Sequence, residues 1–173
     1  MQGTDGREDL SRGAVPARVR VVFPLEVDAD GWPPVGAERL WANALGDNRY
    51  EIDNVPWFVR DLAAHDIVRA VAPDEQSHPV FQQLETRSEH LTVRVICFRA
   101  GPLGGDLQRV IDAFAGLGVY AEGIDQYGMV ALDIPPVAPL RQVYRRLAAG
   151  DQDGSWTWEE GRITASWMAA KDL

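Results

Sequence analysis

The sequence predicts a mixed α+β fold made of an N-terminal small β-barrel or bent antiparallel sheet joined to a C-terminal ferredoxin-like βαββαβ unit. Three observations predict this fold. Up to residue 98, short stretches that alternate apolar and polar residues follow one another closely, as in small barrels. Beyond residue 98, two stretches carry apolar residues at helical spacing. Further strand-like stretches flank both helical stretches and complete the ferredoxin-like order of elements.

The first half of the chain contains a series of expected strands. Gly46, Asp47 and Asn48 are residue types that tolerate positive φ, so we expect a hairpin there with Tyr50 and Ile52 pointing inward. We expect a second hairpin around residues 87–90, in which strand 80–86 pairs with strand 91–98. The strands expected in this half cover residues 18–27, 38–45, 49–53, 67–71 and 80–86.

The second half alternates strands with amphipathic helices. Asp106 is placed to cap the first helix and Gly118 to end it, while Gly150 ends the second. Strands are expected at residues 91–98, 119–125, 129–134 and from Trp156 onward, which gives the order β-α-β-β-α-β. The apolar positions that predict the helices are Leu107, Val110, Ile111, Phe114 and Leu117, then Leu140, Val143, Tyr144 and Leu147.

These elements divide the chain into four parts. We expect a disordered tail over residues 1–17, which are Gly-rich and polar, and a β-rich subdomain over residues 18–90. The ferredoxin-like subdomain follows over residues 91–160, and residues 161–173 form a C-terminal tail. We expect strand 91–98 to belong to both subdomains, which predicts a shared sheet or a tight junction there rather than a flexible linker.

Charge and composition exclude several classes of function. The net charge is -9, which argues against binding of nucleic acid because a phosphate backbone requires a basic surface. No stretch is long and apolar enough to be a signal peptide or to span a membrane. Cys97 is the single cysteine and lies in an apolar alternating run, so we expect a buried, unreactive thiol in a cytoplasmic protein.

Several phrases of the sequence resemble a bacterial family catalogued as domain-of-unknown-function family 4265. The resemblance covers residues 18–160 and implies a bacterial domain, but it implies no reaction. The phrases that carry it are Glu38-Arg39-Leu40-Trp41, Tyr50-Glu51-Ile52-Asp53-Asn54-Val55-Pro56-Trp57-Phe58, His65-Asp66-Ile67-Val68, Arg87-Ser88-Glu89-His90-Leu91-Thr92-Val93-Arg94, Met129-Val130-Ala131-Leu132-Asp133-Ile134-Pro135 and Gly154-Ser155-Trp156-Thr157-Trp158.

The sequence carries no concentrated catalytic signature. The three histidines lack the spacing of a metal site, so we expect neither metal nor cofactor and name no catalytic residue. His65 beside Asp66 suggests a base and its orienting carboxylate, but adjacent strand residues face opposite sides, which favours a structural role. The Gly-rich run 101–105 lacks the spacing of a phosphate-binding loop and is typical of a turn, and the arginines of the second helix are typical of a solvated face.

The candidate ligand site lies at the junction of the two subdomains. An apolar wall beside cationic donors suits an anionic group, although a solvated face with Arg94 paired to a carboxylate is the structural alternative. We interpret the protein as a non-enzymatic binding or regulatory module, immunity-like in binding a basic protein partner, with its oligomeric state open. The alternative is a small enzyme that uses Arg87, His90 and Arg94 on an anionic small molecule. The candidate ligand-binding residues are Trp57, Phe58, Arg87, Ser88, His90 and Arg94.

Overall fold

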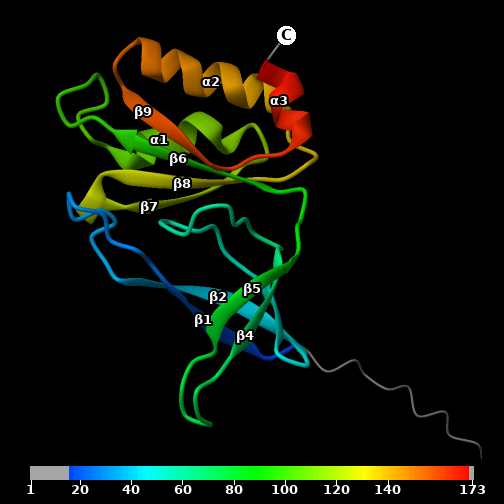
Figure 1. Ribbon diagram of the computed structural model, residues 1–173. Helices are drawn as coiled ribbons and strands as arrows, with labels where there is room; N and C mark the ends of the chain where they lie inside the picture. Colours follow the sequence, from blue (N-terminus) through cyan, green and yellow to red (C-terminus); the bar gives the residue numbers. More distant parts are fainter. Residues whose placement is uncertain (1–15, 172–173) are drawn as a thin grey trace, which may run out of the picture.

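The computed structural model, which describes residues 16–171, places a five-stranded barrel at one end of the molecule and a four-stranded sheet covered by helices at the other (Figure 1). The expected tail over residues 1–17 lies outside the described residues except for Pro16 and Ala17. The barrel closes in the order β1-β2-β3-β4-β5, and its strands are β1 (Arg18–Pro24), β2 (Ala37–Gly46), β3 (Arg49–Ile52), β4 (Ile67–Val71) and β5 (Val80–Thr86).

The barrel core follows from strict alternation along the strands. Val21 and Phe23 of β1, Leu40 of β2 and Ile52 of β3 all point inward and are at most 2% exposed. The expected hairpin between β2 and β3 is confirmed, since Gly46, Asp47 and Asn48 have φ values of 84°, 52° and 60°. A short parallel contact of β1 with β5 completes the barrel, which confirms the small β-barrel predicted for this half.

The sheet has the order β7-β8-β6-β9 and is antiparallel throughout. Along the chain its elements follow as β6-α1-β7-β8-α2-β9, with a 3-10 turn η1 (Asp125–Tyr127) before β8 and a further helix α3 after β9. The strands are β6 (Leu91–Cys97), β7 (Tyr120–Ile124), β8 (Met129–Ile134) and β9 (Trp156–Arg162), and the helices are α1 (Leu107–Ala115), α2 (Leu140–Gln152) and α3 (Ala165–Lys171).

The helices cover one face of this sheet, and the barrel lies under the other (Figure 1). Alternate β6 residues, including Val93 and Val95, pack under Phe114 of α1 and Leu147 of α2 in one apolar core. Asp106 caps α1 as predicted, accepting the backbone N–H groups of Gln108 and Arg109. With the barrel beneath it, β6 is buried on both faces along nearly its whole length.

Two sequence expectations are wrong in this region. Strands β5 and β6 do not form a hairpin, because β5 pairs with β4 and β1 in the barrel while β6 pairs with β8 and β9 in the sheet. Residues 87–90 instead carry the chain from one unit to the other. The expected C-terminal tail contains the end of β9 and helix α3, whose Trp167 is fully buried against Tyr144 and Trp158.

The contact between α2 and β9 requires a glycine. A Cβ on Gly150 would lie 2.0 Å from Cε2 of the buried Trp156, whose indole N–H donates to the carbonyl of Leu147 at 3.0 Å. We therefore expect Gly150→Ala to lower the free energy of unfolding by about 1–3 kcal/mol through overpacking, although alanine favours the helix by about 1 kcal/mol. Denaturant unfolding measures this change.

Gly116→Ala is the matched control. Gly116 has φ −79° and open space around the position of a Cβ, so its replacement should leave the free energy of unfolding unchanged or slightly raise it. If Gly150→Ala proves as harmless as Gly116→Ala, the described packing of Trp156 against α2 is incorrect.

Candidate functional site

The connection between β3 and β4, residues 53–66, crosses the space between the barrel and the sheet (Figure 1). Its middle is fixed by the carboxylate of Glu38, a β2 residue that is 7% exposed. Glu38 accepts the backbone N–H groups of Trp57, Phe58 and Val59 at 2.7, 2.9 and 2.9 Å. Three consecutive amides on one carboxylate make this segment a rigid wall rather than a free loop.

Arg94 fixes the same segment from the sheet side. Its side chain leaves β6 toward the barrel, is 4% exposed, and donates to the backbone carbonyl of Val59 and to Glu159 of β9 at 2.9 Å. Gly161 makes room for it, since a Cβ there would lie 2.8 Å from the guanidinium. Arg94 is therefore part of the junction and does not face an open cavity.

Ser88 and its neighbours also serve the junction. The Ser88 hydroxyl donates to the carbonyl of Ala64 at 2.7 Å, and its backbone N–H donates to the buried carboxylate of Asp66 at 2.6 Å. Arg162 of β9 donates to the backbone carbonyls of Ser88 and His90. The Thr92 hydroxyl donates to the carbonyl of Leu62 at 2.9 Å. These contacts engage the carbonyls of Leu62 and Ala64 and the carboxylate of Asp66 in the crossing segment. The face of β6 that carries Thr92 and Arg94 is therefore buried, whereas the structural alternative had it solvated.

His65 and His90 form a contact that the sequence did not suggest. Their rings lie 4.6 Å apart, and each Nδ1 has its own carboxylate, Glu51 for His65 at 2.8 Å and Asp133 for His90 at 2.7 Å. The pairing of His65 with the adjacent Asp66 does not occur. Asp66 instead accepts the amides of Ala63 and Ser88, and His65 lies in the left-handed region at φ 64°.

Arg87 lies at the surface, where its guanidinium makes a two-pronged contact with Asp61, with one N–O distance of 2.8 Å. Arg87, His90 and Arg94 thus have three separate carboxylate partners, Asp61, Asp133 and Glu159. Each of the three side chains is engaged by its own carboxylate, and the three do not converge on a common cavity. These three side chains and the aromatic pair therefore do not line one common pocket, as the expected anion site required.

The aromatic pair Trp57 and Phe58 does line a cavity, of about 530 Å³, which we call the aromatic pocket. Its opposite wall is the connection between β1 and β2, and Glu159 of β9 closes one side. Phe58 packs edge-on against Trp32 at 5.6 Å and Tyr127 at 5.5 Å, which stabilises the wall. The lining residues are Pro24, Leu25, Glu26, Val27, Asp28, Trp32, Pro33, Trp57, Phe58, Val59, Arg60 and Glu159.

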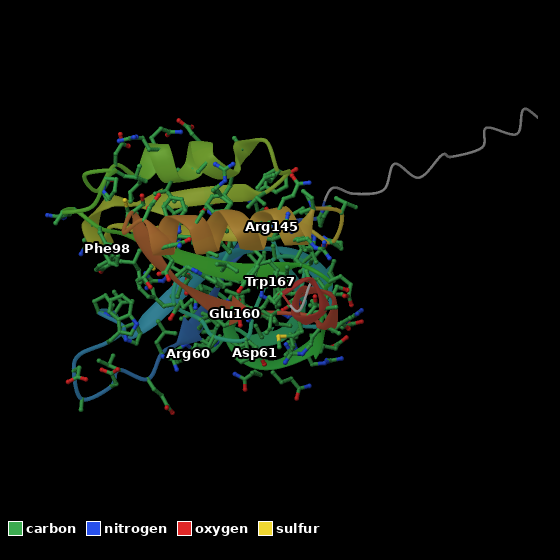
Figure 2. All side chains as sticks on the ribbon, turned by 90° about the horizontal axis from the view of Figure 1, so that it is seen from above. Arg60, Asp61, Phe98, Arg145, Glu160 and Trp167 are labelled. Atoms are coloured by element: carbon green, nitrogen blue, oxygen red, sulfur yellow. The ribbon has the colours of Figure 1, made fainter. Side chains whose placement is uncertain are left out.

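The charge of the aromatic pocket is mainly negative. Among the residues that the structure describes, Glu26, Asp28 and Glu159 line it together with one cationic residue, Arg60. Asp28 also holds the loop shape by accepting the amides of Asp30 and Trp32 at 3.0 and 2.8 Å. The segment that carries Arg60 is hydrogen-bonded to β9, since the amide of Asp61 donates to the carbonyl of Gly161 at 2.9 Å. Figure 2 labels Arg60 and Asp61 of this segment and Glu160 of β9. The pocket therefore suits a cation with an apolar stem better than an anion.

Sequence reasoning missed the part of the pocket that comes from the β1–β2 connection. Glu26 belongs to the pocket because β1 ends at Pro24 instead of running to residue 27 as expected, and Trp32 belongs to it although it lies in no expected strand. The available signal was Trp32 itself, a tryptophan between Gly31 and Pro33 that is 41% exposed. A large aromatic residue in a loop that folding does not bury is typical of a contact surface.

Within residues 16–171, no group of three or more His, Cys, Asp or Glu side chains is arranged to hold a metal ion. None of the helices in this part of the chain is long and apolar enough to cross a membrane. Cys97 is buried, and burial raises the pKa of its thiol.

Fold and site together define a mixed α+β protein in which a closed barrel and a helix-covered sheet meet at a buried polar junction, with an aromatic pocket at its edge. The chain belongs to the family described as domain of unknown function (DUF4265), which matches residues 38–158. It is similar to a solved structure described as a hypothetical protein from Neisseria gonorrhoeae, with a TM-score of 0.64, 18% identity, and coverage of 86% of this chain and 95% of that one. No curated protein matches the chain. The structural likeness shows a shared fold.

The pairing of Arg87 with Asp61 predicts a pH-dependent contribution to stability. Hydrogen bonding from Arg87 is the main cause that lowers the pKa of the Asp61 carboxyl below its ordinary value. A carboxyl whose pKa is lowered by folding stabilises the protein above its unfolded pKa, and this stabilisation is lost as the pH falls through the folded value. We expect Arg87→Gln to raise the pKa of Asp61, measured by NMR titration of its carboxyl.

Arg87→Gln should accordingly be slightly less stable than the wild type at pH 7, and the two should converge only when the pH has fallen below the lowered pKa of Asp61. Arg39→Gln, which changes an exposed arginine of β2 without a described ion pair, is the control. An unchanged Asp61 titration in Arg87→Gln would contradict the pairing.

Proposed function

We propose that this protein is a non-enzymatic binding module that receives a basic side chain of a protein partner in the aromatic pocket. The observation that carries the proposal is the composition of that pocket, which sets Trp32, Trp57 and Phe58 beside the carboxylates of Glu26 and Asp28. Aromatic faces attract a guanidinium or ammonium group through the ring quadrupole, and a carboxylate at the rim pairs with the same charge. Exposed tryptophan is also typical of the residues that dominate protein interfaces.

The charge of the whole protein supports a basic partner. A net charge of -9 attracts a positively charged surface over a long range and accelerates its association. A regulatory or accessory role fits this property, including an immunity-like role in which the protein covers a basic surface of its partner. The segment 57–59 is already held by Glu38, so binding requires little ordering of this wall.

The alternative function, a small enzyme that acts on an anionic small molecule through Arg87, His90 and Arg94, has less support. Each of those groups has its own carboxylate partner, so an anionic substrate would compete with Asp61, Asp133 or Glu159. The charged residues of the pocket beside Trp57 and Phe58 are mainly acidic, and they repel an anion. We therefore favour binding over catalysis.

Two finer proposals concern the fold and the setting. We propose that the sheet unit is ferredoxin-like, which its strand order β7-β8-β6-β9 and the connections through α1 and α2 support. We also propose a bacterial cytoplasmic location, which a single buried cysteine with no cysteine to pair with supports.

The binding proposal is tested with a capped peptide. We expect acetyl-Ala-Arg-Ala-amide to shift the NMR signals of the Trp32 and Trp57 indole N–H groups, and acetyl-Ala-Gln-Ala-amide to leave them in place. Trp32→Ala should weaken binding about two- to fivefold, because an exposed cation–π contact contributes about 0.5–1 kcal/mol. Glu26→Gln should weaken it as well, and added salt should reduce the effect of Glu26.

Glu75→Gln is the matched control, since it removes the same charge from an exposed position in the connection between β4 and β5. It should leave peptide binding unchanged. Equal binding of the arginine and glutamine peptides, or equal losses in Glu26→Gln and Glu75→Gln, would overturn the proposal that the pocket recognises a cation.

A further inference from the structure

A second cavity, a groove of about 560 Å³, lies between α1 and α2 on the helical side of the sheet. Figure 2 looks onto this helical layer and labels Arg145 on α2. Three arginines line the groove, Arg109 from α1 and Arg145 and Arg146 from α2. Within residues 16–171, Asp153 at the end of α2 is the one acidic residue on its wall. The groove therefore carries a net positive charge, whereas the protein as a whole is negative.

These three arginines differ from most of the other arginines in the described chain. Within residues 16–171 none of the three has a carboxylate partner; Arg109 donates to the carbonyl of Pro102 at 3.3 Å. In an acidic protein, three guanidinium groups in one groove that form no ion pair with a described carboxylate are an unusual arrangement. Six others lie within 4.0 Å of a carboxylate, namely Arg18, Arg49, Arg69, Arg87, Arg94 and Arg162.

The groove also has an apolar floor. Leu103, Ala113 and Ala149 line it together with Trp156, whose ring lies against the backbone of Gly150. The carboxylate of Asp153 accepts a hydrogen bond from the backbone amide of Ser155 at 2.9 Å. An anion in the groove would meet three cationic donors over a small apolar surface.

We infer that this groove binds a small molecule bearing a phosphate group. Guanidinium groups pair with phosphate oxygens through two parallel hydrogen bonds, and several of them together neutralise a group that carries two negative charges. The volume falls in the range of small-molecule sites. The groove involves none of the residues of the aromatic pocket, so this inference does not rest on the proposed function.

Isothermal titration calorimetry with pyrophosphate tests the inference, at an ionic strength held constant with sodium chloride. We expect saturable binding to the full chain, and about tenfold weaker binding in Arg145→Gln and in Arg109→Gln, because each removes one charge-assisted contact. All three positions are solvent-exposed, so the variants should melt at the wild-type temperature. Citrate, which carries carboxylates in place of phosphates, should bind more weakly than pyrophosphate.

Arg39→Gln is the control, because it removes one exposed arginine from the barrel. It should bind pyrophosphate like the wild type. Three results would overturn the inference: no binding at millimolar pyrophosphate, binding that Arg145→Gln and Arg109→Gln leave unchanged, or an equal loss in Arg39→Gln. Stronger binding of citrate would reject phosphate as the ligand group.

Discussion

The buried guanidinium of Arg94 connects the parts of this protein that carry its candidate site. It starts on β6, in the middle of the sheet, and bonds to Glu159 on the neighbouring strand and to Val59 in the connection of the barrel. A charge removed from water is costly unless it is paired and hydrogen-bonded, and Glu159 and the Val59 carbonyl provide these contacts for Arg94. This requirement holds the sheet and the barrel in one relative position.

The aromatic pocket follows from that constraint. Residues 57–59 are held from the barrel side by the carboxylate of Glu38, through their amides, and from the sheet side by Arg94, through the Val59 carbonyl. With the backbone fixed on both sides, Trp57 and Phe58 form one wall of the cavity and Glu159 reaches it from β9. The pocket therefore exists because buried charges fix a segment that has no regular secondary structure.

The sequence predicted the parts of the fold that depend on local patterns. Alternation located the strands, the turn at Gly46, Asp47 and Asn48 set one hairpin, and Asp106 marked the start of α1. It failed where neighbours in the chain do not pair, because both edges of β5 are taken up in closing the barrel and the next strand joins another sheet. The partners of Arg94 are 35 and 65 residues away, a separation at which no local pattern operates.

Native-state amide hydrogen exchange of Trp57, Phe58 and Val59 tests this account most directly. If Glu38 and Arg94 hold the segment as described, these three amides exchange only by the opening that also exposes Leu40 in the barrel and Val93 in the sheet, with a similar free energy. Rapid exchange of all three amides in a folded protein, while Leu40 and Val93 stay protected, would contradict it, because the wall of the pocket would then be an ordinary mobile loop.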